Sequence, residues 1–350
     1  MNNQNQTINN AITNQYQQSI FSLITNQIDY WCLVVTVPLG IILNLISIFV
    51  FIRLDMVKST MSFLYINLSV SNAAVLVYYL FVMNSKIIMD YELSKLTDIG
   101  CKITIVIRRV LRSVPTWIEA LITLDRYLAV CYPNRFDYIF KSKRNLFIII
   151  ILIIFLLICL NWINFLYFLG TLTNTVTIGL SLNQNHSTNF TYLSISDRKC
   201  MANNGFDLIG DLCSSLVKTL LPGILIFIWS ILIIRRIRLI KKNLYKIGDS
   251  TTSNLKERHL IIALLSMNLM FFILNFPVLI LAIIRHIYGF IVGPKNQNKI
   301  VQEILGNLYL FTYDIANLYY ILMFVQFLVF NKIFKKEFLM IISGLIDSKE

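Results

Sequence analysis

The sequence predicts an all-α membrane protein, a bundle of seven transmembrane helices followed by an amphipathic eighth helix. The 350-residue chain is 57% hydrophobic and has a mean hydropathy of +0.68, which is too apolar for a soluble domain of this size. We identify seven apolar runs, each long enough to cross a hydrocarbon core of about 30 Å as a helix. They cover residues 30–54, 60–83, 101–131, 144–169, 206–239, 257–286 and 301–330.

The net charge of +13 indicates membrane topology rather than binding of nucleic acid. The lysines and arginines gather in particular loops, and with the N-terminus outside most of them fall on the inner side, as the positive-inside rule requires. We therefore expect a multi-pass protein of the plasma membrane with an extracellular N-terminus and no nucleic-acid partner. The basic inner segments are expected to contact anionic membrane lipid.

The chain divides into three predicted parts: residues 1–29, 30–330 and 331–350. The first is a polar, disordered tail without lysine or arginine, and it carries no cleavable signal. Glycosylation sequons begin at Asn5 in this tail and at Asn185 and Asn189 in the loop after the fourth helix. For Asn5, a chance match in an Asn-rich stretch is the alternative.

The inner end of the third predicted helix carries charge in the stretch LDRYLAVCYP, residues 124–133. An ionisable group at membrane depth costs several kcal/mol unless it is paired or wetted. Asp125, Arg126 and Tyr127, with the flanking residues through Pro133, resemble the motif of rhodopsin-like (class A) G-protein-coupled receptors. The resemblance implies that Asp125 and Arg126 hold such a receptor off and that Arg126 is released to contact a heterotrimeric G protein.

The first two helices carry further polar positions of that family. Gly40 and Asn44 stand one turn apart, and the resemblance implies that the asparagine ties the first helix to the second and seventh. The stretch 67–72 resembles the family's Asn-Leu-Ala-x-x-Asp, but Asn72 replaces the final aspartate, which is the family's buried sodium ligand. The usual sodium pocket is therefore not expected here.

Arginines cluster in the outer half of the third helix. Cys101 and Arg126 are 25 positions apart, or roughly 37 Å along a helix, which suits one tilted crossing. In this register Arg108, Arg109 and Arg112 lie at the level where the family binds ligands, and Lys218 of the fifth helix is expected to join them. A cationic pocket suits an anionic ligand. The alternative is that the arginines snorkel to the interface or pair internally.

Glu119 lies deeper in the same helix, where the family usually has an apolar residue. A carboxyl group buried at mid-membrane must be protonated or paired. One hypothesis is that the carboxylate missing at position 72 has moved to Glu119 and restores a polar core site. The other is a protonated glutamate that is hydrogen-bonded to a neighbour.

The resemblance implies a disulfide between Cys101, at the top of the third helix, and Cys200, in the second outer loop. Such a bond suits the oxidising exterior of the cell. Two free thiols are the alternative.

The sixth helix contains FFILNFP, residues 271–277, which resembles the family's Phe-x-x-Cys-Trp-x-Pro with Asn275 in place of the ligand-sensing tryptophan. This form is similar to that of some invertebrate neuropeptide receptors, and it implies ligand contact for Asn275. Counting back along the helix, Glu257 stands where the family has the acid that pairs with the arginine of the triplet, so Arg126 and Glu257 are a candidate inner lock.

The seventh helix lacks the family's Asn-Pro-x-x-Tyr; residues 323–327 read MFVQF instead. The next stretch, NKIFKKEF at 331–338, matches the start of the family's amphipathic eighth helix. Phe334 and Phe338 form its apolar face, and Lys332, Lys335 and Lys336 are expected to face lipid headgroups.

The function predicted from these patterns is a receptor that binds an extracellular neuropeptide or other anion-bearing messenger and activates heterotrimeric G proteins. A receptor-like protein that binds without coupling and a membrane transporter are the alternatives. The second half of the sequence does not repeat the first, which counts against a transporter. No Ser/His/Asp set, HExxH motif or metal-ligand spacing is present. We expect no enzyme activity, no cofactor and no metal.

Overall fold

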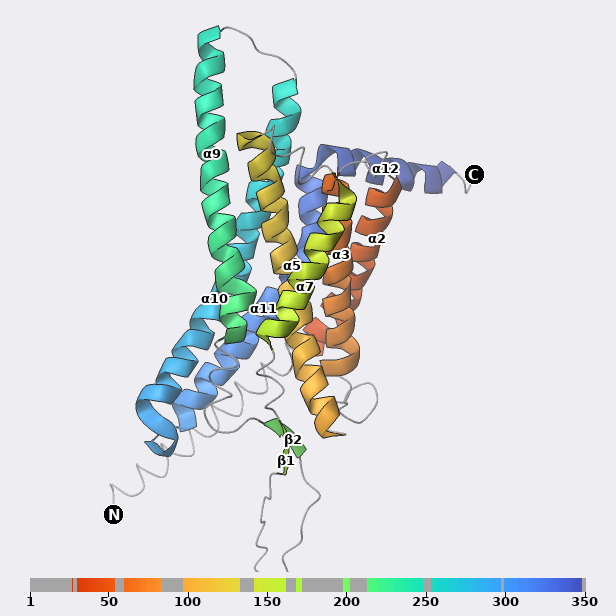
Figure 1. The fold of residues 1–350 in the computed structure, drawn as a ribbon. Helices are drawn as coiled ribbons and strands as arrows, with labels where there is room; N and C mark the ends of the chain where they lie inside the picture. The colour runs from red at the N-terminus through yellow and green to blue at the C-terminus, as the bar shows by residue number, and fades with distance from the viewer. Residues whose placement is uncertain are drawn as a thin grey trace, which may run out of the picture.

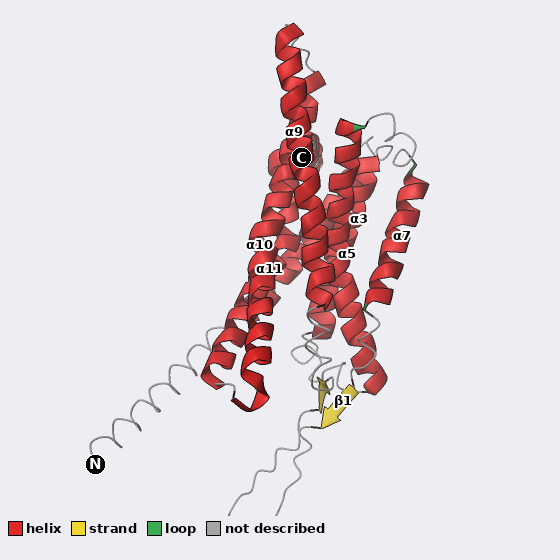
Figure 2. Ribbon diagram, turned by 60° about the vertical axis from the view of Figure 1, so that its left-hand side comes forward, coloured by secondary structure: helices red, strands yellow, loops and turns green. Residues whose placement is uncertain are grey.

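The computed structural model describes residues 27, 30–53, 60–83, 97–132, 142–161, 168–171, 198–201, 213–247, 253–296 and 299–347. Within these ranges the chain is helical except for one short hairpin (Figure 2). Glycosylation sequons at Asn5, Asn185 and Asn189 lie outside the described residues.

Seven long helices form the bundle, and an eighth lies across one end of it (Figure 1). In chain order the elements are η1 (Cys32–Thr36) with α2 (Val37–Arg53), α3 (Thr60–Tyr78) with η3 (Tyr79–Met83), α5 (Asp98–Cys131), α7 (Lys143–Leu160), η6 (Leu216–Leu220) with α9 (Leu221–Ile247), α10 (Ser253–Asn296), α11 (Lys299–Phe330) and α12 (Lys332–Asp347). The segments labelled η are π-helical turns that continue or precede their α-helices.

Six of the seven are long and apolar enough to cross a membrane on their own composition. The exception is α5, because its charged residues lower its hydropathy, yet it packs against α3, α7, α9 and α10 in the bundle. The predicted seven-helix architecture is confirmed, with α5 enclosed by its neighbours.

The prediction that the fourth helix runs to residue 169 is wrong. α7 ends at Leu160, where the Asn161 side chain donates to the Leu157 carbonyl oxygen at 2.7 Å and its backbone N–H also bonds into the last turn. The apolar residues beyond it form β1 (Phe168–Thr171), which pairs antiparallel with β2 (Arg198–Met201). Apolar and aromatic character alone did not distinguish the continuation of a helix from a strand.

Close approach of α2, α3 and α11 depends on Gly40. A Cβ atom built at Gly40 would lie 2.7 Å from both Ile321 Cγ1 and Leu76 Cδ1. One turn along, the Asn44 amide donates to the Gly40 carbonyl oxygen at 2.8 Å and to the Tyr320 carbonyl oxygen at 2.9 Å. The expected tie from the first helix to the seventh is therefore present, and the missing side chain at Gly40 makes room for it.

The amphipathic helix α12 is fixed to the bundle by a hydrogen-bonded N-cap residue and by a buried phenylalanine ring. Asn331 precedes it, and its side-chain oxygen accepts a hydrogen bond from the backbone N–H of Phe334 at 3.1 Å, as an N-cap does. Phe334 is fully buried against Phe51 and Phe327, at ring-centroid distances of 5.0 and 5.6 Å. The predicted lysines are exposed on the other face: Lys332, Lys335 and Lys336.

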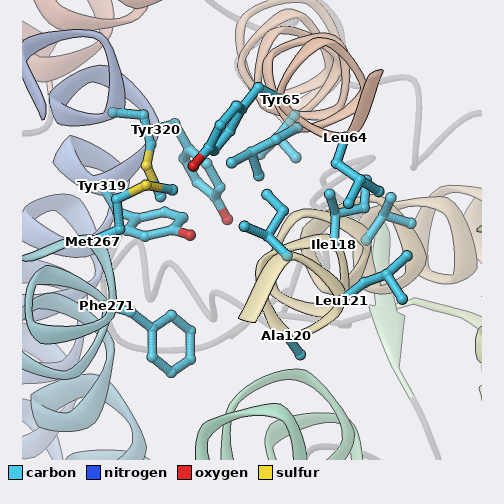
Figure 3. Packing of buried hydrophobic residues seen from close by; sticks show 14 of the residues in the cluster. Leu64, Tyr65, Ile118, Ala120, Leu121, Met267, Phe271, Tyr319 and Tyr320 are labelled. Atoms are coloured by element: carbon cyan, nitrogen blue, oxygen red, sulfur yellow. The ribbon is translucent and has the colours of Figure 1, made fainter. Parts of the chain in front are cut away.

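The core lies between two groups of helices. Figure 3 shows Met267, Phe271 and Tyr319 gathered on the side of α10 and α11, and Leu64 and Ile118 on the side of α3 and α5. Side chains on the outside of the bundle are largely apolar, as expected of a surface that faces lipid.

Replacing Gly40 with alanine should destabilise the protein. A methyl group there overlaps Leu76 and Ile321, and overpacking of this kind costs about 1–3 kcal/mol. Thermal unfolding of the detergent-purified protein measures the change. The control is Gly306→Ala in α11, where a Cβ meets nothing within 4 Å and helix propensity should raise stability by about 0.5–1 kcal/mol. Equal or greater stability of Gly40→Ala than of the parent would contradict the close approach.

Candidate functional site

A cavity of about 290 Å³ opens between α5, η6, α10 and α11, near the end of the bundle where α5 begins and the β1–β2 hairpin lies (Figure 1). Its volume is at the low end for ligand pockets, so it suits a small molecule or the end of a peptide. The cationic and aromatic side chains that line it are Arg108, Arg109, Arg112, Lys218, Arg285, His286, Tyr309 and Tyr313. No carboxylate is among the described residues that line it.

The structure brings together four of the five residues that were predicted to contact the ligand. Arg108, Arg109 and Arg112 of α5 and Lys218 of η6 all line the cavity. Arg112 is only 8% exposed; its Nη2 donates to Asn317 Oδ1 at 3.3 Å, and its guanidinium lies 3.8 Å from the centroid of the Tyr313 ring.

The position of Lys218 follows from Pro222 and the π-helical turn before it. Pro222 has no N–H, so the Lys218 carbonyl loses its usual partner four residues later. The hydroxyl of Thr116 on α5 contacts this carbonyl oxygen at 2.8 Å, and Trp117 Nε1 donates to the Val217 carbonyl oxygen at 3.0 Å. These two contacts hold η6 against α5 and place Lys218 beside Arg112.

Asn275, the fifth predicted ligand contact, is not among the described residues that line the cavity. It is 4% exposed, and its amide donates to the Phe271 carbonyl oxygen of its own helix at 3.2 Å. Val278 and Leu279, about one turn farther along α10, line the cavity instead.

Sequence reasoning missed the contribution of α10 and α11 to the cavity. The sequence patterns did not single out Arg285, Tyr309 or Tyr313, which all line the cavity. The sequence shows a basic residue at the end of the sixth helix and two tyrosines spaced by four on the seventh, but it does not show that they face the arginines of α5.

Below the cavity, Glu119 is fully buried and joined to α11, because the Tyr319 hydroxyl donates to Glu119 Oε2. The other carboxyl oxygen, Oε1, has no hydrogen-bond partner, and neither has the side-chain amide of the fully buried Asn72 nor the Ser69 hydroxyl. α3 and α5 therefore each hold buried polar atoms that the described protein atoms do not satisfy.

A second polar group, which the sequence did not reveal, joins α5, α9 and α10. The Asn268 amide donates to Ser230 Oγ at 2.8 Å, and its Oδ1 accepts from Thr123 Oγ1 at 3.3 Å. Asn268 is 3% exposed and Thr123 is fully buried. Ser230 of α9 thus takes part in a contact that joins three helices.

Near the C-terminal end of α5, Arg126 Nη2 lies 3.2 Å from Asp125 Oδ2, and Asp125 is fully buried while the arginine side chain is 18% exposed. Tyr127 packs edge-to-face against Tyr132, with ring centroids 5.8 Å apart. The side chain of Glu257 lies outside the described residues, so the predicted contact of Arg126 with Glu257 stays a prediction.

Cys101 is fully buried near the start of α5 and is not a free thiol. Cys200 lies in β2 opposite Leu169, but its side chain is outside the described part of the structure. Pairing of these two cysteines stays a prediction.

The family model described as 7 transmembrane receptor (rhodopsin family) matches residues 43–323. None of the curated proteins matches this chain. Because the match spans most of the bundle, the chain belongs to the rhodopsin family of seven-transmembrane receptors, and it is a multi-pass membrane protein.

Replacing Thr116 with valine should destabilise the protein, because the Lys218 carbonyl oxygen then loses its contact with the hydroxyl on α5. An unsatisfied buried acceptor costs about 1–3 kcal/mol. Thr116→Ser keeps the hydroxyl and is the matched control. Thermal unfolding of both variants measures the difference; equal losses for valine and serine would show that the hydroxyl does not hold η6.

Proposed function

We propose that this protein is a plasma-membrane receptor, with its N-terminus outside the cell, that binds an anion-bearing extracellular messenger and activates heterotrimeric G proteins. Membership of the rhodopsin family supports the receptor class. The observation that carries the ligand class is the cavity itself, which several cations and no described carboxylate line. An acidic neuropeptide terminus or a small organic acid fits this chemistry.

The orientation is supported by the distribution of charge between the two ends of the bundle. The end with α12 carries exposed basic residues on two elements (Figure 1): Arg235, Arg236 and Arg238 on α9, and Lys332, Lys335 and Lys336 on α12. Basic residues favour the cytoplasmic side and contact its anionic lipid. The cavity and the β1–β2 hairpin then face the exterior, where a Cys101–Cys200 disulfide and glycans at Asn5, Asn185 and Asn189 belong.

Two contacts between α5 and α11 connect the cavity to the buried core of the bundle, so that ligand binding can affect the core. Arg112 donates to Asn317, and two residues farther along α11 Tyr319 donates to Glu119. An anion that draws the Arg112 guanidinium toward itself competes with Asn317 for the same donor. Binding thus acts on the pair α5 and α11, and the next contact between these two helices is the hydrogen bond from Tyr319 to the buried carboxyl group of Glu119.

The inner end supplies the group that meets the G protein. Among the described residues, Asp125 is the ion-pair partner that holds Arg126. A shift of α5 relative to α10 changes the Thr123–Asn268–Ser230 contact and exposes the Arg126 guanidinium to a partner. Gln326 Nε2, which donates to the Ser266 carbonyl oxygen at 3.3 Å, ties α11 to α10 in the same region.

A receptor that binds its ligand without coupling is the second candidate. It is favoured by residues 323–327, where Met323 and Phe324 replace the family's asparagine and proline and α11 runs without interruption to Phe330. The next experiment separates the two candidates.

Replacing Asp125 with asparagine should raise basal guanine-nucleotide exchange severalfold, because it removes the charge that holds Arg126. Adding Arg126→Gln should abolish the gain. Exchange is measured with the purified receptor in lipid nanodiscs and a panel of heterotrimers of different Gα classes, so no ligand is needed. Arg144→Gln, an exposed residue of α7, is the control and should leave exchange unchanged.

If Asp125→Asn left exchange at the parental level with every heterotrimer, the binding-only candidate would replace the coupled receptor. A gain that persisted in the Asp125→Asn/Arg126→Gln double variant would show that coupling does not pass through Arg126.

We also propose that Glu119 supplies the carboxylate that position 72 lacks and holds a sodium ion with the amide of Asn72. Sodium chloride should then raise the unfolding temperature of the parent above its value in choline chloride, since a ligand of the native state stabilises it. Glu119→Gln should lose this response, whereas Tyr319→Phe, which keeps the carboxylate, should retain it. A sodium response of equal size in Glu119→Gln would favour the protonated, hydrogen-bonded glutamate.

A further inference from the structure

Three hydroxyl groups line the cavity together with its cations, and all three belong to the segment that carries Lys218. Ser214 and Ser215 lie in the helical turn that leads into η6, and Thr219 lies within η6. Ser214 precedes Lys218 by four residues and Ser215 precedes Thr219 by four, which is close to one helical turn in each case. The three hydroxyls and the Lys218 amine therefore lie on one side of the segment, the side that lines the cavity.

These hydroxyls differ from most others in the bundle. A serine or threonine inside a helix commonly donates to a carbonyl oxygen of the preceding turn, as Ser113, Thr123 and Ser230 do at 2.8, 2.9 and 2.6 Å. Within the described part of the chain, the Ser214, Ser215 and Thr219 hydroxyls make no such bond, and Ser215 makes no capping bond at the start of η6. Thr219 is only 5% exposed. A ligand in the cavity can therefore accept from all three.

The cations that lie nearest to these hydroxyls are Arg112 and Lys218. The Thr116 hydroxyl, one turn along α5 from Arg112, contacts the Lys218 carbonyl oxygen, and α5 and α9 run side by side in Figures 1 and 2. The Lys218 amine is near enough to Arg112 for the two cations to repel each other. Arg112 donates to the neutral side chain of Asn317. Two cations and three hydroxyls thus gather where α5 meets η6.

We propose that this part of the cavity binds a phosphate monoester. The phosphate group lies between Arg112 and Lys218, and its oxygens accept hydrogen bonds from the three hydroxyls. The inference rests on the proposed anion-binding function and deepens it by naming the anion.

Charge and donor count both favour phosphate over a carboxylate. A carboxylate carries one charge on two oxygens, which together accept about four hydrogen bonds. A phosphate monoester carries about −1.5 to −2 charges at pH 7 on three strong acceptor oxygens. It can pair with both cations and still accept from the hydroxyls, whereas a carboxylate leaves some of these donors without an acceptor, which costs free energy in a site that excludes water.

The organic part of the ligand meets the side of the cavity formed by α10 and α11. Val278, Leu279 and Ala282 of α10 line it, together with Leu310 and two tyrosines of α11. The cavity volume of about 290 Å³ admits a phosphate joined to a small ring or to the end of a chain. Two sources present this chemistry: a lipid with a phosphate monoester headgroup, and a water-soluble phosphate such as a nucleoside monophosphate.

The test follows the unfolding temperature of the full-length receptor, in nanodiscs of phosphatidylcholine, against probe concentration. The probes are phenyl phosphate, methyl phenyl phosphate, phenyl sulfate and phenylacetate, which share a ring and differ in the charge and shape of the acid. We expect phenyl phosphate to bind about tenfold more tightly than the other probes, because each of those carries a single charge. A further gain with an acylglycerol phosphate would identify the lipid source, and a further gain with a nucleoside 5′-monophosphate the soluble one.

Variants of the hydroxyls separate phosphate binding from a general attraction to anions. Thr219→Val, and Ser214→Ala combined with Ser215→Ala, should each weaken binding of phenyl phosphate about tenfold, while phenylacetate, which needs fewer donors, should change little. The matched control is Thr312→Val in α11, because that hydroxyl donates to the Leu308 carbonyl oxygen of its own helix at 3.0 Å and does not line the cavity. It should change the binding of neither probe.

Variants of the two cations test the charge requirement. Lys218→Gln should remove the preference for phenyl phosphate over methyl phenyl phosphate, because one positive charge then remains between α5 and η6. Arg112→Gln should weaken the binding of every probe.

Equal affinity of phenyl phosphate and phenylacetate, or of phenyl phosphate and phenyl sulfate, would overturn the phosphate assignment while leaving an anion site in place. Hydroxyl variants that weaken phenylacetate as much as phenyl phosphate would do the same. Absence of stabilisation by every probe, or insensitivity of every probe to Arg112→Gln, would instead remove the anion-binding function on which the inference rests.

Discussion

The structure depends on how the bundle accommodates the charges of α5. Arg109, Arg112, Glu119 and Asp125 are each at most 8% exposed, although all four lie on a helix that crosses the membrane. A charged residue at the centre of a lone transmembrane helix costs about 2.5–3.5 kcal/mol on insertion scales. α5 therefore needs its neighbours: other helices supply tyrosine rings, amide groups and hydroxyls that lipid does not.

This requirement explains why the polar contacts concentrate around one helix. Each level of α5 faces a partner suited to it: Tyr313 and Asn317 at Arg112, Tyr319 at Glu119, and Asn268 at Thr123. Each contact crosses from one helix to another, so a change at the cavity alters the packing of α5 against α10 and α11 rather than a single side chain. Apolar residues at these positions would serve stability alone, so the presence of polar ones agrees with the signalling role that we propose.

The sequence predicted the architecture because apolar length and charge asymmetry are local properties that a membrane enforces. It predicted the α5 arginines as one group, because a single helical register fixes their depth, and it added Lys218 of the fifth helix to them. Prediction from the sequence failed where the structure of one segment depended on its packing against another segment. Whether Phe168 and Leu169 continue a helix or belong to β1 depends on pairing with β2, and the side to which Asn275 turns depends on the packing of α10. Arg285 and the two tyrosines required the contact between α10 and α11, which no local pattern encodes.

Membrane insertion of α5 in isolation tests the central claim most directly. Residues 98–131 and, as the apolar reference, residues 143–160 of α7 are placed in turn in a reporter protein with glycosylation sites on both sides, and insertion into endoplasmic-reticulum membranes is scored. The account predicts that α7 inserts and that α5 does not, and that α5 with leucine at Arg112, Glu119 and Asp125 does. Insertion of the unmodified α5 as efficient as that of α7 would show that the helix tolerates its charges without the bundle.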